Sequence, residues 1–314
     1  MPDFRKARVL VIGDVMLDQY ITGNTSRISP EAPVPVVHVN GTHYQAGGAG
    51  NVALNLAELG CATTLVGLVG KDRQAATLKK ILDESKVDGI LFESDFPTIT
   101  KIRVISRAQQ LIRLDYEEPF ELLPKEESKL VQAVEKIIPY HHVIILSDYA
   151  KGCLSENVCR KIIAAGQNAG IPVVTDPKNR NWERYAGSYV ITPNFREFCE
   201  AAGKDIPNTS EAIDKEGKKW IGRSGAGYIL ITRSEKGMSL VTPGKVFHWD
   251  ALAREVYDVS GAGDTVVAAL SGALACGMPI EEAAQLANAA AGIVVGKSGT
   301  ATVSTTELSE IKMV

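Results

Sequence analysis

The segment DVSGAGD, residues 258–264, carries the strongest chemical signal in the chain. Gly261 and Gly263 allow successive backbone amides to turn toward one point, and a helix that begins there adds the positive end of its dipole. Such a turn can hold a phosphoryl group. Asp264 would lie inside this anion hole, where phosphate repels a carboxylate unless the carboxylate takes up a proton. We interpret Asp264 as a general base for an attacking hydroxyl; the alternative is an aspartate that only stabilises the helix N-terminus.

Asn194 and Glu197 lie three residues apart, directly after the apolar run YVIT. This spacing predicts that both side chains share one face of a first helical turn. An amide beside a carboxylate suits a magnesium ion that keeps several of its waters while it binds nucleotide phosphates. The same pair also suits a helix cap, and the two interpretations stay open.

A second glycine cluster, GGAGN, precedes the helical pattern NVALNLAEL. Gly47 and Gly48 would let a ligand approach the backbone, and Asn51 offers a donor and an acceptor to a polyol. Asp14 and Asp18 flank the end of the first apolar run, where they could accept hydrogen bonds from vicinal sugar hydroxyls. Each is equally compatible with a cap or a turn.

Three basic residues, Lys101, Arg103 and Arg107, occur at spacings of two and four in a stretch without helical periodicity. In a strand this spacing predicts one shared face. Such a face is either a solvated basic surface or a pocket for an anionic part of a substrate.

Short β-branched apolar runs alternate with longer helical patterns along most of the chain. This alternation predicts an α/β fold, a doubly wound, mainly parallel sheet with helices on both faces. The predicted strands are 8–12, 143–146, 172–175, 189–192 and 228–232. The predicted helices are 51–59, 73–85, 125–138, 155–169, 210–223, 264–276 and 280–295. Because such sheets bind ligands at the carboxyl ends of their strands, the polar residues that follow these runs are site candidates.

Residues 19–44 and 97–116 lack helical periodicity, and their composition predicts strands outside the main sheet. We interpret them as a small β lid, so that residues 1–314 form one domain with lid segments at about 16–46 and 92–117. A lid made of strands leaves exposed edges that a second subunit could cover, and we therefore expect a homodimer.

Composition excludes several classes of function. The 34 basic and 37 acidic residues leave a net charge of −3, so no general basic field exists to hold nucleic acid or an anionic membrane. No apolar stretch approaches the roughly twenty residues that span a bilayer. The five cysteines show neither a CxxC pair nor zinc-ligand spacing, which predicts reduced thiols and a cytoplasmic protein. The first predicted strand ends without the GxGxxG of a dinucleotide-dependent dehydrogenase.

Taken in chain order, GGAGN, NFRE and DVSGAGD resemble three signature motifs of the ribokinase-like (PfkB) carbohydrate kinases. The resemblance implies a ribokinase-like fold with a β-strand lid, and transfer of the γ-phosphoryl group of ATP to a sugar hydroxyl. Further segments are similar to the branch of this family that phosphorylates the C1 hydroxyl of D-glycero-β-D-manno-heptose 7-phosphate, a step of ADP-heptose and lipopolysaccharide core synthesis. These segments are SRISPEAPVPV, TITKIRVISRAQQLIRLDYE, LSDYAKG, TDPK and TRSEKGMSL.

The resemblance also implies roles for individual residues. Asp264 matches the catalytic base. The amides that match the anion hole are those of Gly261, Ala262 and Gly263. The residues that match the organisers of Mg²⁺ and the ATP phosphates are Asn194 and Glu197. The matched sugar-binding positions are Asp14, Gly47, Gly48 and Asn51.

The same resemblance places the nucleotide and a monovalent cation. The positions that line the nucleotide site in relatives are matched by Thr232, Ser234, Gly237 and Asn288. The positions that hold a monovalent cation such as K⁺ in relatives are matched by Asp258 and Ser260. A substrate that already carries a 7-phosphate needs a second anion site away from ATP, and the cationic candidates for it are Lys101, Arg103, Arg107 and Lys178.

Relatives in this branch continue into a nucleotidylyltransferase domain with an HxGH motif. No HxGH motif occurs in this sequence, so we expect the kinase reaction alone. Two alternatives stay open: another kinase of the family, acting on a sugar, a fructose phosphate or a nucleoside, and a sugar- or nucleotide-binding regulator without turnover. Asp264 disfavours the regulator, because binding alone needs no base in the anion hole.

Overall fold

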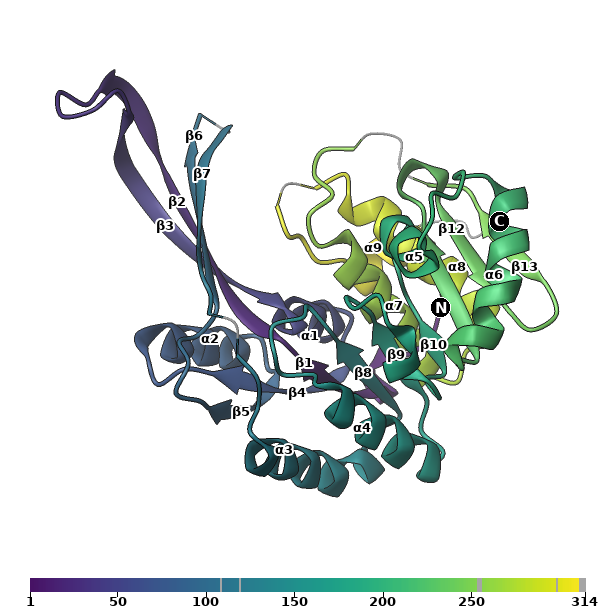
Figure 1. Ribbon diagram of the computed structural model, residues 1–314. Helices are drawn as coiled ribbons and strands as arrows, with labels where there is room; N and C mark the ends of the chain where they lie inside the picture. Colours follow the sequence, from purple (N-terminus) through teal and green to yellow (C-terminus); the bar gives the residue numbers. More distant parts are fainter. Residues whose placement is uncertain (108, 119, 253–255, 298, 311–314) are drawn as a thin grey trace.

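The computed structural model describes residues 1–107, 109–118, 120–252, 256–297 and 299–310. In these ranges the main sheet has nine strands, in the order β13-β12-β11-β10-β9-β8-β1-β4-β5 (Figure 1). Its strands are β1 (Arg8–Gly13), β4 (Ala62–Val69), β5 (Asp88–Glu93), β8 (Val143–Ser147), β9 (Val173–Asp176), β10 (Val190–Ile191), β11 (Tyr228–Thr232), β12 (Met238–Val241) and β13 (Val246–Trp249). Neighbours from β11 to β5 pair in parallel, and β12 and β13 are antiparallel additions at one edge. The predicted doubly wound, mainly parallel sheet is therefore confirmed.

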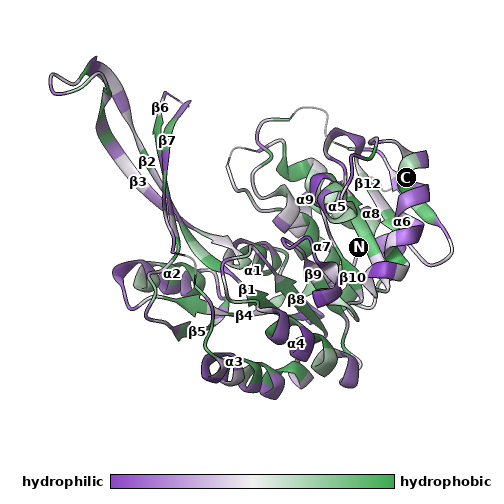
Figure 2. Cartoon of the chain, viewed as in Figure 1, coloured by the Kyte–Doolittle hydropathy of each residue, from purple (hydrophilic) through white to green (hydrophobic). Residues whose placement is uncertain are grey.

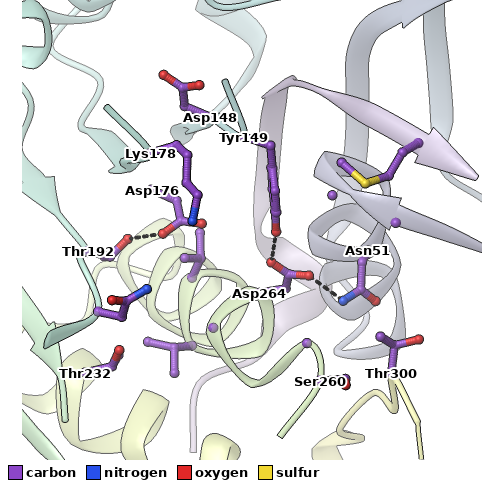
Figure 3. Close-up of a pocket in the computed structure, with 18 of the residues that line it drawn as sticks. Asn51, Asp148, Tyr149, Asp176, Lys178, Thr192, Thr232, Ser260, Asp264 and Thr300 are labelled. Atoms are coloured by element: carbon purple, nitrogen blue, oxygen red, sulfur yellow. Dashed lines mark hydrogen bonds between the residues drawn. The ribbon is translucent and has the colours of Figure 1, made fainter. Parts of the chain in front are cut away.

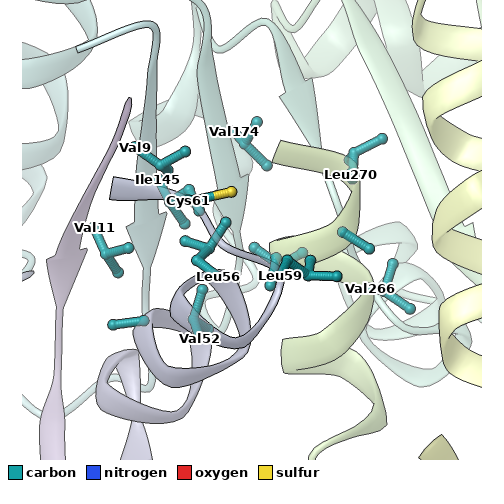
Figure 4. Close-up of a cluster of buried hydrophobic side chains, with 14 of the residues drawn as sticks. Val9, Val11, Val52, Leu56, Leu59, Cys61, Ile145, Val174, Val266 and Leu270 are labelled. Atoms are coloured by element: carbon teal, nitrogen blue, oxygen red, sulfur yellow. The ribbon is translucent and has the colours of Figure 1, made fainter. Parts of the chain in front are cut away.

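Helices cover both faces of this sheet, because alternate residues of each strand point to opposite sides. The helices that pack with Val9 and Val11 on one face are α1 (Ala49–Glu58), α2 (Arg73–Glu84), α7 (Ala262–Ala275), α8 (Ile280–Val294) and α9 (Thr305–Glu310). Figure 4 shows Leu56 of α1 and Val266 of α7 in this layer. The helices that pack with Leu10 and Ile12 on the other face are α3 (Pro124–Ile137), α4 (Glu156–Asn168), α5 (Phe195–Ala202) and α6 (Ser210–Ser224). Short 3-10 helices occur at Phe4–Lys6, Ile138–Tyr140, Trp182–Tyr185 and Ser234–Lys236.

The layers explain the hydropathy pattern of the chain. Figure 2 shows hydrophobic central strands such as β1 and β8 enclosed between helices that carry hydrophilic residues on their outer sides. Fully buried strands read as continuous apolar runs, which is why the sequence revealed them. None of the helices in the described ranges combines the length and the apolar character needed to cross a bilayer.

The sheet is extended in opposite directions from its two central strands. From β1 it continues through β4 to β5, and from β8 it continues the other way through β9, β10 and β11. In such sheets a ligand site is expected at the carboxyl ends of the two strands where the direction changes, here β1 and β8. Asp14 directly follows β1, and Asp148 directly follows β8.

A second sheet projects from one side of the main sheet, and we call it the lid (Figure 1). Its strand order in the described ranges is β3-β2-β6-β7. The lid strands are β2 (Val15–Ile28), β3 (Pro35–Gly48), β6 (Thr100–Ser106) and β7 (Gln109–Tyr116). They contain the strands that we predicted outside the main sheet. Phe92 and Glu93, which fall within the predicted second lid segment, belong to β5 instead.

Candidate active site

A cavity of about 330 Å³ lies where the carboxyl ends of the main-sheet strands meet the base of the lid (Figure 3). Most residues that we predicted from the sequence line it. They are Asp18, Gly47, Gly48, Asn51, Lys101, Arg103, Lys178, Asn194, Glu197, Thr232, Ser260, Gly261, Gly263 and Asp264. The tertiary structure thus brings motifs from distant parts of the chain to one space.

Asp264 lies in the first turn of α7, and the glycines before it explain the local backbone. Gly261 is the N-cap residue, with a φ of 79° that favours glycine. A Cβ on Gly261 would also come within 2.9 Å of Asn51 Nδ2. Gly263 instead faces open space, so an anionic ligand can approach the backbone there.

Residue Asp264 is only 8% exposed, and two donors hold its carboxylate at the cavity wall (Figure 3). The phenol of Tyr149 donates to Oδ1, and Asn51 Nδ2 donates to Oδ2 at 2.6 Å. Burial raises the pKa of Asp264 to about 6, although both hydrogen bonds act to lower it. A carboxylate with this pKa is mostly ionised at neutral pH and can still accept a proton, as a general base must.

The glycines before α1 are required by close contacts with β2. A Cβ on Gly48 would lie 2.4 Å from the carbonyl oxygen of Asp14, and a Cβ on Gly47 would lie 2.5 Å from Asp18 Oδ2. Because Gly47 and Gly48 have no side chains, the start of α1 can approach β2, and Asn51 then lies at the cavity.

Asp14 is placed differently from the prediction. Its side chain does not line the cavity and is 2% exposed. Its Oδ2 accepts backbone amide hydrogens from Tyr149 at 2.8 Å and Lys151 at 3.0 Å, and its Oδ1 accepts one from Cys153 at 3.0 Å. The predicted contact of Asp14 with sugar hydroxyls is therefore replaced by contacts with the loop after β8.

Three residues of the lid, Asp18, Lys101 and Arg103, line the cavity. Parallel pairing of β2 with β6 sets Asp18 opposite Lys101 and Tyr20 opposite Arg103. Arg103 Nη1 lies 2.5 Å from Asp18 Oδ1, and the guanidinium lies over the Tyr20 ring, 5.3 Å from its centroid. The amine of Lys101 lies 3.9 Å from Glu117 Oε2.

Arg107 does not share the face of Lys101 and Arg103, contrary to the prediction. Strand β6 ends at Ser106, and its pairing with β7 is irregular after Val104. Arg107 follows in the turn with a φ of 49° and lies outside the cavity lining. The period of two holds only while the strand continues, so the spacing could not place Arg107.

Asn194 and Glu197 form the cap at the start of α5, which confirms the cap interpretation. Both residues also line the cavity, and the magnesium interpretation stays a prediction. Asn194 Oδ1 accepts the Glu197 amide hydrogen at 2.9 Å, and Glu197 Oε2 accepts the Asn194 amide hydrogen at 3.0 Å. The other carboxylate oxygen of Glu197, Oε1, accepts a hydrogen bond from Lys178 Nζ at 3.0 Å. Lys178 therefore lies beside the Asn194–Glu197 pair.

Two further cavity residues, Asp176 and Tyr149, were given no individual role by the sequence, although Asp176 follows a predicted strand. Asp176 ends β9 and accepts a hydrogen bond from Thr192 Oγ1 at 3.2 Å. Burial, together with the charges of Glu197 and Asp264, raises the pKa of Asp176 well above its usual range. Both residues stand at or just after the carboxyl end of a predicted strand, within TDPK and LSDYAKG, which is the signal that could have identified them.

A second cavity, of about 440 Å³, adjoins the first, and Thr232, Gly263 and Val266 line both. The other predicted residues that line it are Ser234, Gly237, Ala262 and Asn288. Apolar side chains line it as well, among them Met238, Leu252, Val259 and Val295. An apolar slot that opens toward an anion hole suits a nucleoside triphosphate, with the base in the slot and the phosphates at the start of α7.

Asp258 lies outside both cavity linings, beside Ser260. Its Oδ1 accepts the Ser260 amide hydrogen at 2.9 Å, and its Oδ2 accepts the Gly299 amide hydrogen at 3.0 Å. The carboxylate thus joins the loop before α7 to the loop after α8. Within the described ranges, His, Cys, Asp and Glu side chains form no group of three or more that could hold a metal ion.

Comparison with known proteins agrees with this geometry. Residues 6–307 match the model of the pfkB family of carbohydrate kinases. Bifunctional protein HldE of Pectobacterium atrosepticum is 49% identical over 310 residues, which cover 98% of this chain and 64% of that protein. Phosphofructokinase-2 from Escherichia coli, solved in complex with potassium, has a TM-score of 0.82 at 20% identity and covers 97% of this chain and 98% of its own. Arabidopsis thaliana ribokinase, solved with ribose and ATP, has a TM-score of 0.74 at 21% identity and covers 98% of this chain and 99% of its own.

The match to the family model, together with the doubly wound fold, places this chain among the kinases that act on a sugar hydroxyl group. This chain belongs to the pfkB family of carbohydrate kinases, which confirms the family and the enzyme class predicted from the motifs. Membership implies a sugar and ATP as substrates, and a divalent cation. The chain spans slightly less than two thirds, 64%, of the length of the HldE relative.

Proposed function

We propose that this chain transfers the γ-phosphoryl group of ATP to the C1 hydroxyl of D-glycero-β-D-manno-heptose 7-phosphate, in ADP-heptose and lipopolysaccharide core synthesis. One observation carries the proposal: Asp264 at the anion hole and the lid cations Lys101 and Arg103 face the same cavity. Such a cavity suits an acceptor with a reactive hydroxyl at one end and a phosphate at the other. The heptose-kinase motifs and the 49% identity to HldE support the same acceptor.

In this reaction Asp264 accepts the proton of the C1 hydroxyl while the hydroxyl oxygen forms its bond to the γ-phosphorus. The bond from the γ-phosphorus to the bridging oxygen breaks, and ADP leaves with that electron pair. The amides of Gly261, Ala262 and Gly263, at the N-terminus of α7, stabilise the negative charge on the transferred group. Asn51 holds the second oxygen of the Asp264 carboxylate throughout.

Cations fit the oxygen-rich side of the cavity. Asn194 and Glu197, joined by Asp176, would offer oxygens of the kind that Mg²⁺ binds, in part through water. When bound, Mg²⁺ neutralises phosphate charge. Asp258 and Ser260 lie together and offer oxygens to K⁺, and the potassium complex of phosphofructokinase-2 supports a test for K⁺ here.

The lid supplies the site for the 7-phosphate in this proposal. Lys101 and Arg103 enter the cavity from β6, whereas Lys178 is bonded to Glu197 on the main-sheet side. We assign Lys101 and Arg103 to the acceptor phosphate, and Lys178 to the phosphates of ATP.

The lid also supports a homodimer. Its apolar side chains Ile28, Val39, Ile112, Leu114 and Tyr116 are between 40% and 62% exposed. A second copy of the chain that packs against the lid would cover this apolar surface. The free cysteines and the use of ATP fit a reaction in the cytoplasm.

The test is an ATP-consumption assay with heptose 7-phosphate, fructose 6-phosphate, ribose and adenosine as acceptors. We expect the highest kcat/KM with heptose 7-phosphate, and ADP and the 1,7-bisphosphate as products. In the same assay Asp264→Asn should lose turnover while it still binds ATP. A higher kcat/KM with any other acceptor would contradict the proposed substrate, and undiminished turnover of Asp264→Asn would contradict the proposed base.

A further inference from the structure

The loop after β8 connects a buried carboxylate to the proposed base. Tyr149, in this loop, reaches the cavity wall, and its phenol donates a hydrogen bond to Asp264 Oδ1 (Figure 3). Asn51 binds the other oxygen, so both oxygens of the carboxylate have a fixed donor. Tyr149 and Asp264 are separated by 115 residues in the chain, and the contact therefore depends entirely on the tertiary structure.

Asp14 anchors the backbone of this loop. Its carboxylate accepts the amide hydrogens of Tyr149, Lys151 and Cys153, all within 3.0 Å. Ala150, between them, has a φ of 55°, a conformation that a residue with a side chain keeps only when its surroundings hold it. Three hydrogen bonds to one carboxylate fix the position from which Tyr149 extends.

We infer that Tyr149 is a positioning residue for phosphoryl transfer: its phenol orients the Asp264 carboxylate and keeps it ionised, and Asp14 acts through it. The inference rests on the proposed role of Asp264 as the base. Each carboxylate oxygen has two lone pairs, so the acceptor hydroxyl can bind Asp264 while Tyr149 stays in place.

The electrostatics of the contact agree with this role. Burial, and then the charge of Asp264, raises the pKa of the Tyr149 phenol well above its usual range, so Tyr149 remains a donor at any pH at which the enzyme works. A donor to a carboxylate favours the ionised form, and the bond from Tyr149 lowers the pKa of Asp264 against the effect of burial. Without the phenol hydroxyl, Asp264 would hold its proton to a higher pH.

Other charged groups also face the cavity. They are Asp18, Lys101 and Arg103 from the lid, and Asp148, Asp176, Lys178 and Glu197 from the main-sheet side. The phosphate of the acceptor itself titrates near pH 6, with a second pKa of about 6. All of these groups are the same in wild type and in a Tyr149 variant, so the comparison of the two pH profiles isolates the effect of the phenol hydroxyl.

The test is the pH profile of kcat/KM for Tyr149→Phe, because this ratio reports the groups of the free enzyme. We expect the acid limb to move up by about one pH unit, which lowers the rate roughly tenfold at pH 6 and much less at pH 8. Tyr185→Phe is the matched control: its phenol donates to Asp148 Oδ2 at 2.5 Å, beside the same loop, without touching Asp264. Its acid limb should stay at the wild-type position.

An unchanged acid limb in Tyr149→Phe, or an equal shift in Tyr185→Phe, overturns the inference. If Asp264→Asn loses turnover but Tyr149→Phe keeps the wild-type pH profile, the role of Tyr149 is rejected and the role of Asp264 as the base stands. If Asp264→Asn keeps its turnover, the role of Asp264 as the base is rejected. Site-specific 3-fluorotyrosine at Tyr149 is a second variant that keeps the ring and its hydroxyl. Its more acidic phenol is a stronger donor, so the acid limb should move to lower pH; a shift upward would also overturn the inference.

Discussion

At the scale of single residues, the burial of Asp264 suits its proposed role but lowers the stability of the folded protein at neutral pH. The carboxylate that we propose as the base is buried, and burial favours its protonated form. Its pKa of about 6 in the folded protein lies above the ordinary value of 3.8. The protonated form of Asp264 is the one that the folded protein favours. The stability that comes from this protonated form is fully present below the pKa of the unfolded chain, and it is lost as the pH rises through the pKa of the folded protein.

Asp264→Asn should therefore stabilise the ligand-free protein at neutral pH relative to wild type. The gain should grow between about pH 4 and pH 6 and then level off, with an upper limit of about 3 kcal/mol from the difference of roughly two pKa units. Urea unfolding of both proteins at pH 4.5 and pH 7.5 measures it. Equal free energies of unfolding for the two proteins at both pH values would show that burial does not raise this pKa.

At the scale of elements, strand register decides which basic residues can meet an acceptor phosphate. The pairing of β2 with β6 directs Lys101 and Arg103 to the cavity, and the end of β6 leaves Arg107 in the turn. Arg103 already shares a hydrogen bond with Asp18, whereas Lys101 is 3.9 Å from its acidic neighbour Glu117. A substitution of Lys101 therefore tests the proposed phosphate site with less disturbance of other contacts than a substitution of Arg103.

Lys101→Met should raise the KM for heptose 7-phosphate roughly ten- to a hundredfold, because a charge-assisted contact to phosphate is lost. The KM for ATP should change little, since in the proposed function ATP binds at the start of α7 and in the second cavity. Steady-state kinetics with each substrate varied in turn separates the two effects. Lys80→Met, on the exposed side of α2, removes the same charge and is the control. An unchanged KM for heptose 7-phosphate in Lys101→Met would reject the lid as the site of the acceptor phosphate.

At the scale of the whole molecule, the lid is a thin sheet that exposes apolar residues instead of enclosing a core of its own. Ile112 on β7 is 51% exposed and Tyr116 is 57% exposed, while the strands of the main sheet are covered on both faces. A sheet with uncovered apolar residues and an open edge is a surface for association.

Ile112→Lys should convert the proposed dimer to a monomer, because the charge would lose its hydration in the apolar interface. Sedimentation velocity over a range of concentrations measures the change. Tyr140→Lys, at a site that is 66% exposed and outside the lid, should leave the assembly as it is in wild type. A wild-type protein that sediments as a monomer at every concentration would exclude the dimer.

The sequence by itself determined the layered α/β fold, the family and the glycine turn at the start of α7. These depend on local properties: buried strands read as apolar runs, and DVSGAGD specifies its turn through its own glycines. Asp14 and Asp18 look alike in the sequence, four residues apart, and only the tertiary structure turned one to the loop after β8 and the other to the cavity. The contact of Tyr149 with Asp264 was equally invisible, because it joins the loop after β8 to the first turn of α7, 115 residues further along the chain. Periodicity reports which face of an element is buried, whereas the partner of a buried polar group is decided by how separate elements pack.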